Sequence, residues 1–369
     1  MNEASFTVDA PDLIDAVRKA SSVAPSKGST FVISAGIRFE VQGGKVLVKA
    51  TDRETFYRGE IQAVEVKGFP EPFRTPASVV SGWLGRLPTG ADSTITMTVK
   101  PEQAKVMVTC GKSKGNFSLI TDDSFISIDA FDPKNLLEVP DLAAKLRRIS
   151  WAPGDSGAIS GVHVDGNYLI AASNSGCAII EAKIPVDAPI TAPLTSISTA
   201  LQKHRGPVWM GVDGRKLLLM PADGDQYTAN IFAETFPNVW PFVPQDDAIK
   251  WVSVSKEVVL AALGRIIALA AEDKEIASVD ILIDGDTVFL EATVDEYGRV
   301  EEELELVTGL PDGDSFEIRF DPKKLQAAID NCAFGVAHIG FTENVKPVKV
   351  TDKAGYTAVV MPLVPRRKS

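Results

Sequence analysis

The sequence predicts an α+β fold in which one architecture occurs three times, each time with two helices packed on antiparallel strands. Three observations in the 369 residues predict it. An apolar helical period opens each third of the chain, alternating strand-like runs around a Gly turn follow it, and a Pro-initiated helix comes next. Because the order is the same each time, we expect a repeat period of about a third of the chain.

The opening helices are expected at Pro11–Lys19, Pro140–Arg148 and Lys256–Arg265, where apolar residues recur at helical spacing. The runs after them alternate apolar and polar residues, and Asn, Asp or Gly marks the turn in each, which is typical of β-hairpins. These hairpins are predicted within Gly36–Val48, Gly161–Ala171 and Val279–Ala292.

A second helix is predicted after Thr75-Pro76, after Ala192-Pro193 and after Asp321-Pro322. Proline suits the first helical turn, because the N–H that it lacks would have no partner there. More strands close each repeat, for example Thr94–Val99 with Lys105–Cys110. The same pattern gives strands at Pro207–Val212 and Lys216–Met220.

These elements divide the chain into three predicted domains, at residues 1–125, 129–245 and 246–369. Each has roughly 120 residues, enough to bury a core. An apolar share of 45% is ordinary for a globular protein. No apolar run has the roughly 18 residues of a membrane helix, and the segment from Met1 to Ala4 lacks the features of a signal peptide. We therefore expect a cytoplasmic protein.

Catalytic and metal-binding signatures are weak throughout. The three cysteines (Cys110, Cys177, Cys332) and three histidines (His163, His204, His338) are far apart, which favours buried apolar roles over metal ligation. No nucleophile elbow, phosphate-binding loop or zinc-protease motif occurs. The sequence therefore predicts no enzyme, no cofactor and no metal.

A hydrolase remains an alternative, since carboxylates can act as acids and bases or hold a metal. It would use Asp52, Asp165 and Asp295, which follow strands at loosely equivalent places. Acidic clusters also occur at Asp122-Asp123, Asp246-Asp247 and Glu301-Glu302-Glu303. Without a His or Cys partner, solvated loops and strand faces explain them better.

The charge distribution is uneven. A net charge of −11 argues against general adhesion to a polyanion. The predicted helices are nevertheless relatively basic, so that helices facing one way would form a positive lining. The basic residues on or beside them are Arg18, Lys19, Arg86, Lys145, Arg147, Arg148, Lys203, His204, Arg205, Arg265, Lys323 and Lys324.

Three segments resemble the bacterial DNA polymerase III beta sliding clamp. Ala50–Glu54 is similar to that family's Ala-Thr-Asp strand end, and Ala233–Pro244 to its Phe-Pro-Asp/Asn segment. Tyr356–Leu363 is similar to its Val-Val-Met-Pro tail. With the threefold repeat, the resemblance covers essentially the whole chain. Divergences from the family pattern suit a phage, plasmid or paralogous member.

The resemblance implies a head-to-tail homodimeric ring of six similar domains, with helices around a central hole. Duplex DNA passes through the hole without sequence being read, and the ring tethers the replicative polymerase for processive synthesis. The implied partners are double-stranded DNA, a DNA polymerase and a clamp loader, the last two through short linear motifs. The alternative is a non-replicative clamp-like scaffold or decoy that binds replication factors.

The resemblance also implies a peptide-binding cleft between the second and third domains. Where the family usually has Thr-Asp-Gly-His-Arg-Leu, this chain has Ser173–Ala178, and Pro241 stands where an Arg is common. We therefore expect a reshaped pocket with a different motif preference. The expected cleft residues are Ile159, Ser173, Ser175, Gly176, Cys177, Ala178, Pro237, Pro241, Phe242, Pro347, Val359, Met361, Pro362 and Leu363.

Two further sets follow from the resemblance. The expected dimer interface joins Phe117 of one chain to Ile267, Leu269 and Ala270 of the other. The helix residues expected to face DNA are Lys27, Arg86, Lys145, Arg148, Lys203 and Arg205. Arg18 and Lys19 are adjacent, so only one of them is expected to point inward.

Overall fold

A computed structural model describes most of the chain as two compact units. Unit 1 comprises residues 1–147, 185–187 and 192–233, and unit 2 comprises residues 148–184, 188–191 and 234–369. The described residues are 4–25, 36–68, 70–88, 90, 93–121, 125–126, 129–184, 186–245, 249–270, 278–294, 298–311 and 314–364.

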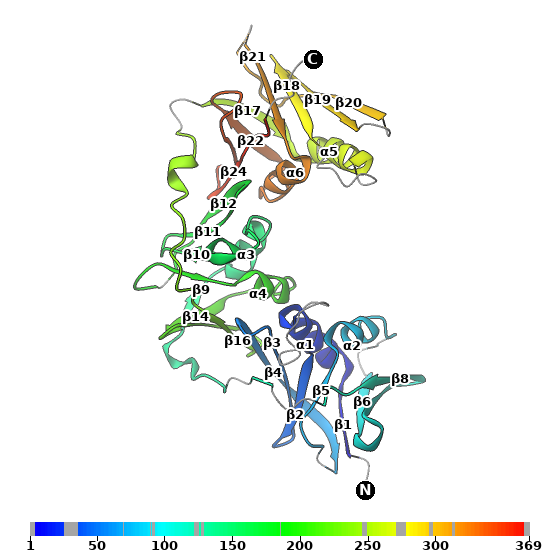
Figure 1. The fold of residues 1–369 in the computed structure, drawn as a ribbon. Helices are drawn as coiled ribbons and strands as arrows, with labels where there is room; N and C mark the ends of the chain where they lie inside the picture. The colour runs from blue at the N-terminus through cyan, green and yellow to red at the C-terminus, as the bar shows by residue number, and fades with distance from the viewer. Residues whose placement is uncertain are drawn as a thin grey trace. The chain divides into compact units, whose positions relative to one another are not determined.

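Unit 1 contains helices on one side of a large antiparallel sheet (Figure 1). Its helices are α1 (Ala10–Val23), α2 (Ala77–Leu84), α4 (Thr195–Ala200) and most of α3 (Leu142–Ile149). Its strands are β1 (Ala4–Asp9), β2 (Ile37–Gln42), β3 (Lys45–Thr51), β4 (Thr55–Lys67), β5 (Phe73–Thr75), β6 (Thr94–Lys100), β7 (Lys105–Cys110), β8 (Ser113–Ser118), β9 (Leu137–Val139), β14 (Val208–Asp213), β15 (Lys216–Pro221) and β16 (Gln226–Asn230).

Strand β4 is the centre of this sheet. The order is β8-β7-β6-β1-β4-β16-β15-β14-β9, while β3 also pairs with β4 and continues to β2 and β5. The 13 residues of β4 are long enough for Ala63–Lys67 to pair with β1, Phe56–Gln62 with β3 and Thr55–Arg58 with β16. One sheet therefore joins strands from the predicted first and second domains.

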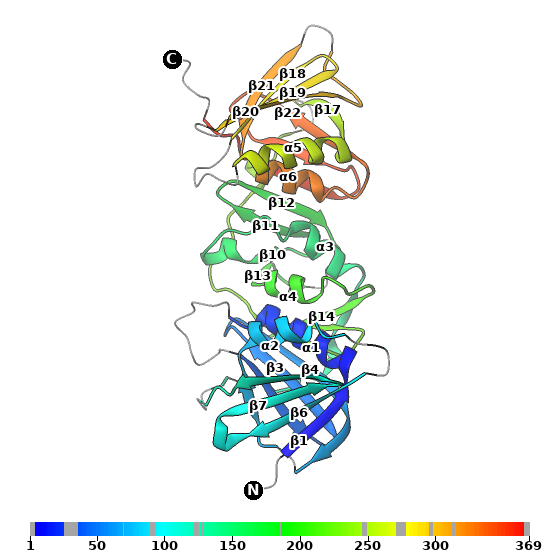
Figure 2. The same cartoon turned by 90° about the vertical axis from the view of Figure 1, so that its right-hand side faces the viewer.

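Helices α1 and α2 pack on this sheet, and α1 also lies beside α4 (Figure 2). Pro11 lies in the first turn of α1, as the sequence predicts. The core below contains Phe6, Phe39 and Phe73, whose ring centroids are 5.2 to 6.3 Å apart. Such aromatic packing buries a large apolar area and stabilises the helix layer on the sheet.

Lys19 connects α1 to the turn before β16. Its Nζ lies 2.8 Å from Asp15, 2.6 Å from Asp223 and 2.6 Å from Asp225. Burial alone would lower the pKa of Lys19, but the three carboxylates outweigh it and raise the pKa, so the ammonium stays charged. Tyr57 also donates to Asp225, at 3.2 Å. Lys19 therefore has a structural role in this ion-pair network. Of the two adjacent cations, Arg18 is the one that extends to α4, where it donates to the Ala200 carbonyl.

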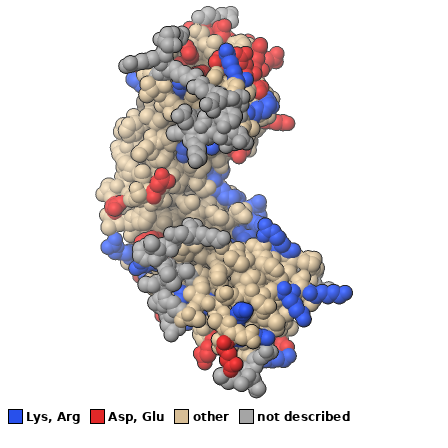
Figure 3. Space-filling view, turned by 45° about the vertical axis from the view of Figure 1, so that its right-hand side comes forward, with Lys and Arg blue, Asp and Glu red and all other residues tan. Residues whose placement is uncertain are grey.

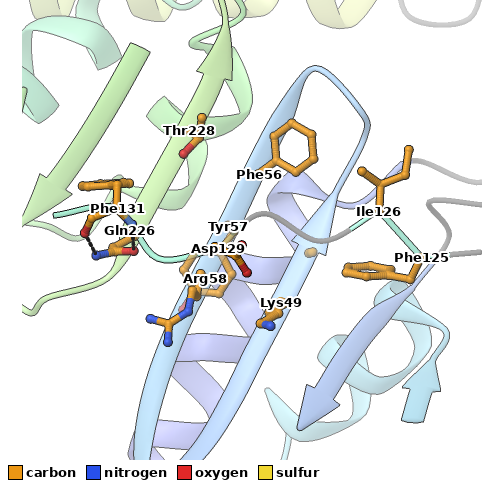
Figure 4. A pocket seen from close by; sticks show the side chains of 11 residues that line it. Lys49, Phe56, Tyr57, Arg58, Phe125, Ile126, Asp129, Phe131, Gln226 and Thr228 are labelled. Atoms are coloured by element: carbon orange, nitrogen blue, oxygen red, sulfur yellow. Dashed lines mark hydrogen bonds between the residues drawn. The ribbon is translucent and has the colours of Figure 1, made fainter. Parts of the chain in front are cut away.

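Phe125, Ile126, Asp129 and Phe131, which precede β9, lie against strands β3, β4 and β16 of unit 1 (Figure 4). The backbone N–H of Phe131 donates to the Gln226 Oε1 at 3.2 Å, and the Gln226 amide donates back to the Phe131 carbonyl at 3.1 Å. The side chains around it leave a cavity of only about 10 Å³. That space is at the lower limit for a water molecule, so this contact is packing and not a ligand site.

Unit 2 contains an eight-stranded and a four-stranded antiparallel sheet, with α5 and α6 side by side. Its helices are α5 (Lys256–Ala270) and α6 (Pro322–Asp330). Its strands are β10 (Val162–Val164), β11 (Tyr168–Ser173), β12 (Gly176–Glu181), β13 (Ile190–Ala192), β17 (Lys250–Ser255), β18 (Val279–Asp284), β19 (Thr287–Val294), β20 (Gly298–Glu305), β21 (Ser315–Phe320), β22 (Val336–Phe341), β23 (Val348–Thr351) and β24 (Tyr356–Val360).

The eight-stranded sheet has the order β13-β10-β11-β12-β24-β23-β22-β17. Its central pair, β12 and β24, joins the predicted second and third domains, with Cys177 opposite Val359. The four-stranded sheet has the order β20-β19-β18-β21, and α5 packs against β19 and β20. The two middle strands of the larger sheet therefore bring residues that are far apart in sequence to one place.

The predicted α+β class with repeated helix and hairpin elements is confirmed. Each predicted helix is present, including the Pro-initiated α6, whose first turn is capped by the Asp321 carboxylate. The domain boundaries at 125, 129, 245 and 246 stay predictions. In the described part of the chain, no helix is long and apolar enough to cross a membrane, and no group of three His, Cys, Asp or Glu could hold a metal.

Candidate functional site

A hollow of about 290 Å³ opens in unit 2 beside the paired strands β12 and β24. Its floor is apolar and buried, with Ala172, Cys177 and Val359 each at most 4% exposed. A site of this size holds one or two side chains of a docked peptide. The described residues that line it are Ile159, Ala172, Ser173, Asn174, Gly176, Cys177, Pro237, Asn238, Val239, Phe242, Val359 and Met361.

Gly176 allows β12 and β24 to approach closely at this place. Its φ of +151° is a backbone conformation that L side chains rarely adopt. A Cβ at this position would lie 2.1 Å from the Val359 carbonyl oxygen. The family's usual Gly-His-Arg-Leu run is here Ser175-Gly176-Cys177-Ala178, so small side chains leave the hollow open above the strand pair.

The rim is formed by the segment from Phe236 to Val243. Phe236 and Val239 are buried in one apolar cluster with Cys177 and Val359, and the Phe236 ring stacks on His163 at 4.8 Å. These anchors hold a short turn whose Phe242 N–H donates to the Val239 carbonyl at 3.0 Å. The turn presents Phe242 to solvent, where it is 58% exposed. An exposed aromatic beside an apolar hollow is typical of a binding surface.

No charged residue lines this hollow among the described residues. Cys177 adds no charge either, because burial raises the pKa of its thiol to about 12. The polar groups are the hydroxyl of Ser173 and the amides of Asn174 and Asn238. The site therefore suits an apolar side chain accompanied by uncharged hydrogen-bonding groups.

The structure brings together eight of the predicted cleft residues and adds four that sequence reasoning missed. Ile159, Ser173, Gly176, Cys177, Pro237, Phe242, Val359 and Met361 line the hollow, together with Ala172, Asn174, Asn238 and Val239. Of the other predictions, Ala178 is fully buried opposite Ala358, and Ser175 accepts a hydrogen bond from the Met361 N–H. Pro241, Pro347, Pro362 and Leu363 lie outside the lining.

A cluster of cations gathers at the carboxyl end of α4 in unit 1. Arg18 donates to the Ala200 carbonyl at 3.1 Å, and Arg147 donates to those of Leu201 and Gln202, both at 3.2 Å. Arg205 also donates to the Gln202 carbonyl, at 3.2 Å. The carbonyls at a helix carboxyl end attract cations. We call Arg18, Arg147, Lys203 and Arg205 the α4 cation cluster.

The cluster brings like charges close together at Arg147. Burial lowers the pKa of Arg147, and the nearby Arg205 lowers it further by like-charge repulsion. Lys203 and Arg205 are exposed. Lys and Arg side chains gather along the helix-bearing side of unit 1 in Figure 3. Such a surface attracts phosphates.

Arg148, also predicted to face DNA, has its guanidinium engaged inside unit 2. It pairs with the buried Asp352, donates to the Asn331 carbonyl at 2.7 Å and lies over the Tyr356 ring at 4.7 Å. Burial opposes ionisation of Asp352, but N–H groups of Ala333 and Ala354 and the charge of Arg148 lower its pKa. These contacts favour a structural role for Arg148.

The remaining predicted DNA-facing residues differ in their surroundings. Arg86 is exposed and donates to the Gly82 carbonyl at 2.6 Å. Lys145 is half-buried on α3. Lys27 lies outside the described residues. Their roles stay predictions.

Phe117, predicted at the dimer interface, lies on β8 at one edge of the sheet of unit 1. Its ring points inward and meets Trp83 of α2 edge-on, with centroids 5.4 Å apart, and it is 8% exposed. Ile267 is half-buried on α5, whereas the side chains of Leu269 and Ala270 lie outside the described residues. In the described part of the chain, β8 and β20 each lie at an edge of their sheet, with the basic Lys112 and Lys114 beside or on β8 and the acidic Glu301, Glu303 and Glu305 on β20.

Comparisons with known proteins agree with this architecture. Residues 242–364 match the family model of the DNA polymerase III beta subunit, C-terminal domain. No curated protein matches the chain.

Among solved structures, the DNA polymerase III beta subunit of Thermotoga maritima is 22% identical, with a TM-score of 0.79, over 98% of this chain and 100% of that one. The Bacillus subtilis sliding clamp is 19% identical, with a TM-score of 0.76, over 99% and 100%. The Pseudomonas aeruginosa clamp bound to griselimycin is 17% identical, with a TM-score of 0.73, over 99% and 100%. At these identities the likeness establishes the fold. The chain therefore has the fold of bacterial DNA polymerase III beta sliding clamps, and its residues 242–364 match that family's C-terminal domain.

Proposed function

We propose that this chain is a DNA sliding clamp that encircles duplex DNA and tethers a replicative polymerase for processive synthesis. The observation that carries the proposal is the agreement in fold over 98% of this chain and all of the Thermotoga maritima beta subunit. It acts without catalysis, because a ring needs only to stay linked to DNA, and its place of action is the cytoplasm.

The ring forms from two chains, head to tail, through unlike edges. Edge strands expose unpaired N–H and C=O groups, which a second chain can pair. The β8 edge carries Lys112 and Lys114, whereas the β20 edge carries Glu301 and Glu305. Opposite charges favour pairing of β8 with β20 over pairing of either edge with itself. Such heterologous contacts close into a ring when the rotation from one chain to the next brings the second chain back into contact with the first.

Reversed charges test this interface. Lys112→Glu with Lys114→Glu weakens the dimer, and adding Glu301→Lys with Glu305→Lys restores it, as followed by solution mass against the 39.5 kDa chain. Charge reversal is cleaner than replacing Phe117, because the Trp83 contact makes that ring part of the core of its own chain. A quadruple variant that stays as weak as the double variant contradicts this pairing.

The ring stays on DNA because it encircles the duplex, and not because it contacts the duplex tightly. The α4 cation cluster attracts phosphates, while the net charge of −11 opposes adhesion elsewhere. Contacts to phosphates carry no sequence information, so the ring can slide along any duplex. The three domains with boundaries at 125, 129, 245 and 246 are the units of the ring.

The cleft of unit 2 binds short linear motifs of the polymerase and the clamp loader. An uncharged lining and small floor residues favour a motif with an apolar anchor at the hollow. Because the family's usual His, Arg and large apolar residue are absent, we expect a motif preference different from that of other clamps. A charge placed at the anchor of a bound polymerase peptide should abolish its binding.

The decisive experiment is retention on nicked circular DNA, after loading with the clamp loader of the same genome and ATP. Retention in high salt that disappears when the circle is cut supports a closed sliding ring. Binding that ignores the cut contradicts it, because direct contact does not depend on topology. The same loader is tested in parallel with a different sliding clamp that it is able to load. If that clamp is retained and this chain is not, the clamp-like scaffold or decoy is favoured.

A further inference from the structure

The four-stranded sheet of unit 2 has one face turned to solvent in the described part of the chain. Along β18, Ile281 and Ile283 are buried on the inner face, whereas Leu282 between them is 41% exposed. Along β19, Val288 and Leu290 are buried and Phe289 is 37% exposed. Two large apolar side chains therefore lie on the outer face, although strand alternation elsewhere in this sheet places polar residues there.

The register places these two side chains next to each other and between two carboxylates. Leu282 is directly opposite Phe289, Phe289 is opposite Glu303 of β20, and Leu282 is opposite Glu317 of β21. One row across the four strands is thus Glu303, Phe289, Leu282, Glu317. Cross-strand neighbours lie about 5 Å apart, so Leu282 and Phe289 form one continuous apolar patch.

The rows on either side are mostly acidic. Rows two residues away on the same face are Glu305, Thr287, Asp284, Ser315 and Glu301, Glu291, Asp280, Arg319. Arg319 pairs with Asp280 at 2.7 Å, and Arg299 pairs with Glu291 at 2.7 Å and also with Glu301. Among the described residues, Glu303, Glu305, Glu317 and Asp284 have no ion pair. We call this grid the acidic face. Figure 3 shows Asp and Glu side chains gathered at this end of unit 2.

An apolar pair framed by unpaired carboxylates is complementary to a basic segment with an apolar centre. We propose that the acidic face binds a basic segment of a partner protein, whose apolar side chain covers Leu282 and Phe289 and whose Lys or Arg residues meet Glu303 and Glu317. Such a contact removes apolar surface from water and pairs four charges across one row. The proposal does not rest on the clamp function, because it uses only this sheet.

The spacing of the row specifies the segment. Glu303 and Glu317 are three strand spacings apart, which is about 14 Å at roughly 4.8 Å per spacing. In an extended segment, residues i and i+4 are separated by about 13 Å and point to the same side as i+2. The expected motif is therefore basic, any, apolar, any, basic. It differs from the cleft partner, because the cleft lining is uncharged.

The test uses isothermal titration of the full chain with the capped peptide Lys-Ser-Leu-Ser-Lys-Ser-Leu-Ser-Lys. Binding is expected to weaken at least tenfold in Leu282→Ser with Phe289→Ser. Glu303→Gln with Glu317→Gln is expected to weaken it at least tenfold at low salt and to reduce its salt dependence. Phe334→Ser is the control, since Phe334 is 60% exposed in the same unit but off this face, and should change affinity less than twofold.

Three outcomes overturn the proposal. No binding by the unaltered chain means that the face is only a solvated surface. Equal binding by the Leu282→Ser, Phe289→Ser variant means that the peptide is attracted by net charge alone. Strengthening by tenfold on truncation after Val364 would assign the face to the chain's own basic end, Arg366-Arg367-Lys368, because Leu363 donates to the Arg319 carbonyl beside β21. Thermal unfolding verifies that the variants fold, and Leu282→Thr with Phe289→Thr replaces a serine variant that does not.

Discussion

Replacing Phe242 by alanine should separate peptide binding from folding. Phe242 lines the hollow of unit 2 and is 58% exposed, so its ring has little packing to lose. A docked peptide that covers the exposed part removes roughly 100 Å² of aromatic surface from water. At about 25 cal/mol per Å², this contributes up to about 2.5 kcal/mol, or roughly 60-fold in Kd.

The assay is fluorescence polarisation with a labelled peptide that carries the clamp-binding motif of the polymerase from the same genome. We expect Phe242→Ala to weaken binding about 10- to 60-fold. Its melting temperature should stay within about 1 °C, because surface substitutions change stability by about 0.5 kcal/mol or less. The control is Phe334→Ala, an aromatic that is 60% exposed in the same unit but away from the hollow. Equal affinities of the two variants would refute the assignment of the cleft.

Three other predictions concern charge. Asp352→Asn should lower the free energy of unfolding of unit 2 by about 3 kcal/mol, because Arg148 and the N–H groups around Asp352 lose a buried acceptor. Asp330→Asn, at an exposed position, should change that free energy little. Denaturant unfolding measures both variants. Because the pKa of Asp352 is lowered in the folded state, its contribution is present above about pH 4 and is lost as pH falls through the folded pKa, so an acid titration of stability should be flatter in Asp352→Asn. Arg147→Gln with Arg205→Gln should reduce the slope of log binding constant against log salt concentration for duplex DNA by up to about 2. The control is Lys134→Gln. If the double variant has the same slope as the control, these arginines lie away from DNA.

The elements of this fold were predictable because their signals are local. The period of Pro11–Lys19 and the turn residues of the hairpins specify α1 and the strand pairs without help from distant residues. The separation of the two adjacent arginines on α3 was not predictable. Arg148 pairs with Asp352, which lies 204 residues away, whereas Arg147 extends to the end of α4.

The cleft shows the same limit. Gly176, Met361 and Phe242 could be placed by resemblance, because they lie in recognisable segments. Ala172 and Val239 are small or aliphatic residues like many in the core, and no chemical signal distinguishes them. They line the hollow only because β11 pairs with β12 and Val239 packs beneath the turn. Lys19 is a further case, since its burial depends on Asp223 and Asp225.

Two strand pairings, β4 with β16 and β12 with β24, determine how the protein unfolds. Residues from Phe56 to Arg58 of β4 pair with β16, and Cys177 of β12 pairs with Val359 of β24, so the middle third is hydrogen-bonded to both of its neighbours. Cooperativity should follow these ladders and not the repeats, which gives two melting transitions where the threefold pattern suggests three. Excising residues 129–245 should therefore yield a fragment without native structure, because both of its outer strands would lose their partners.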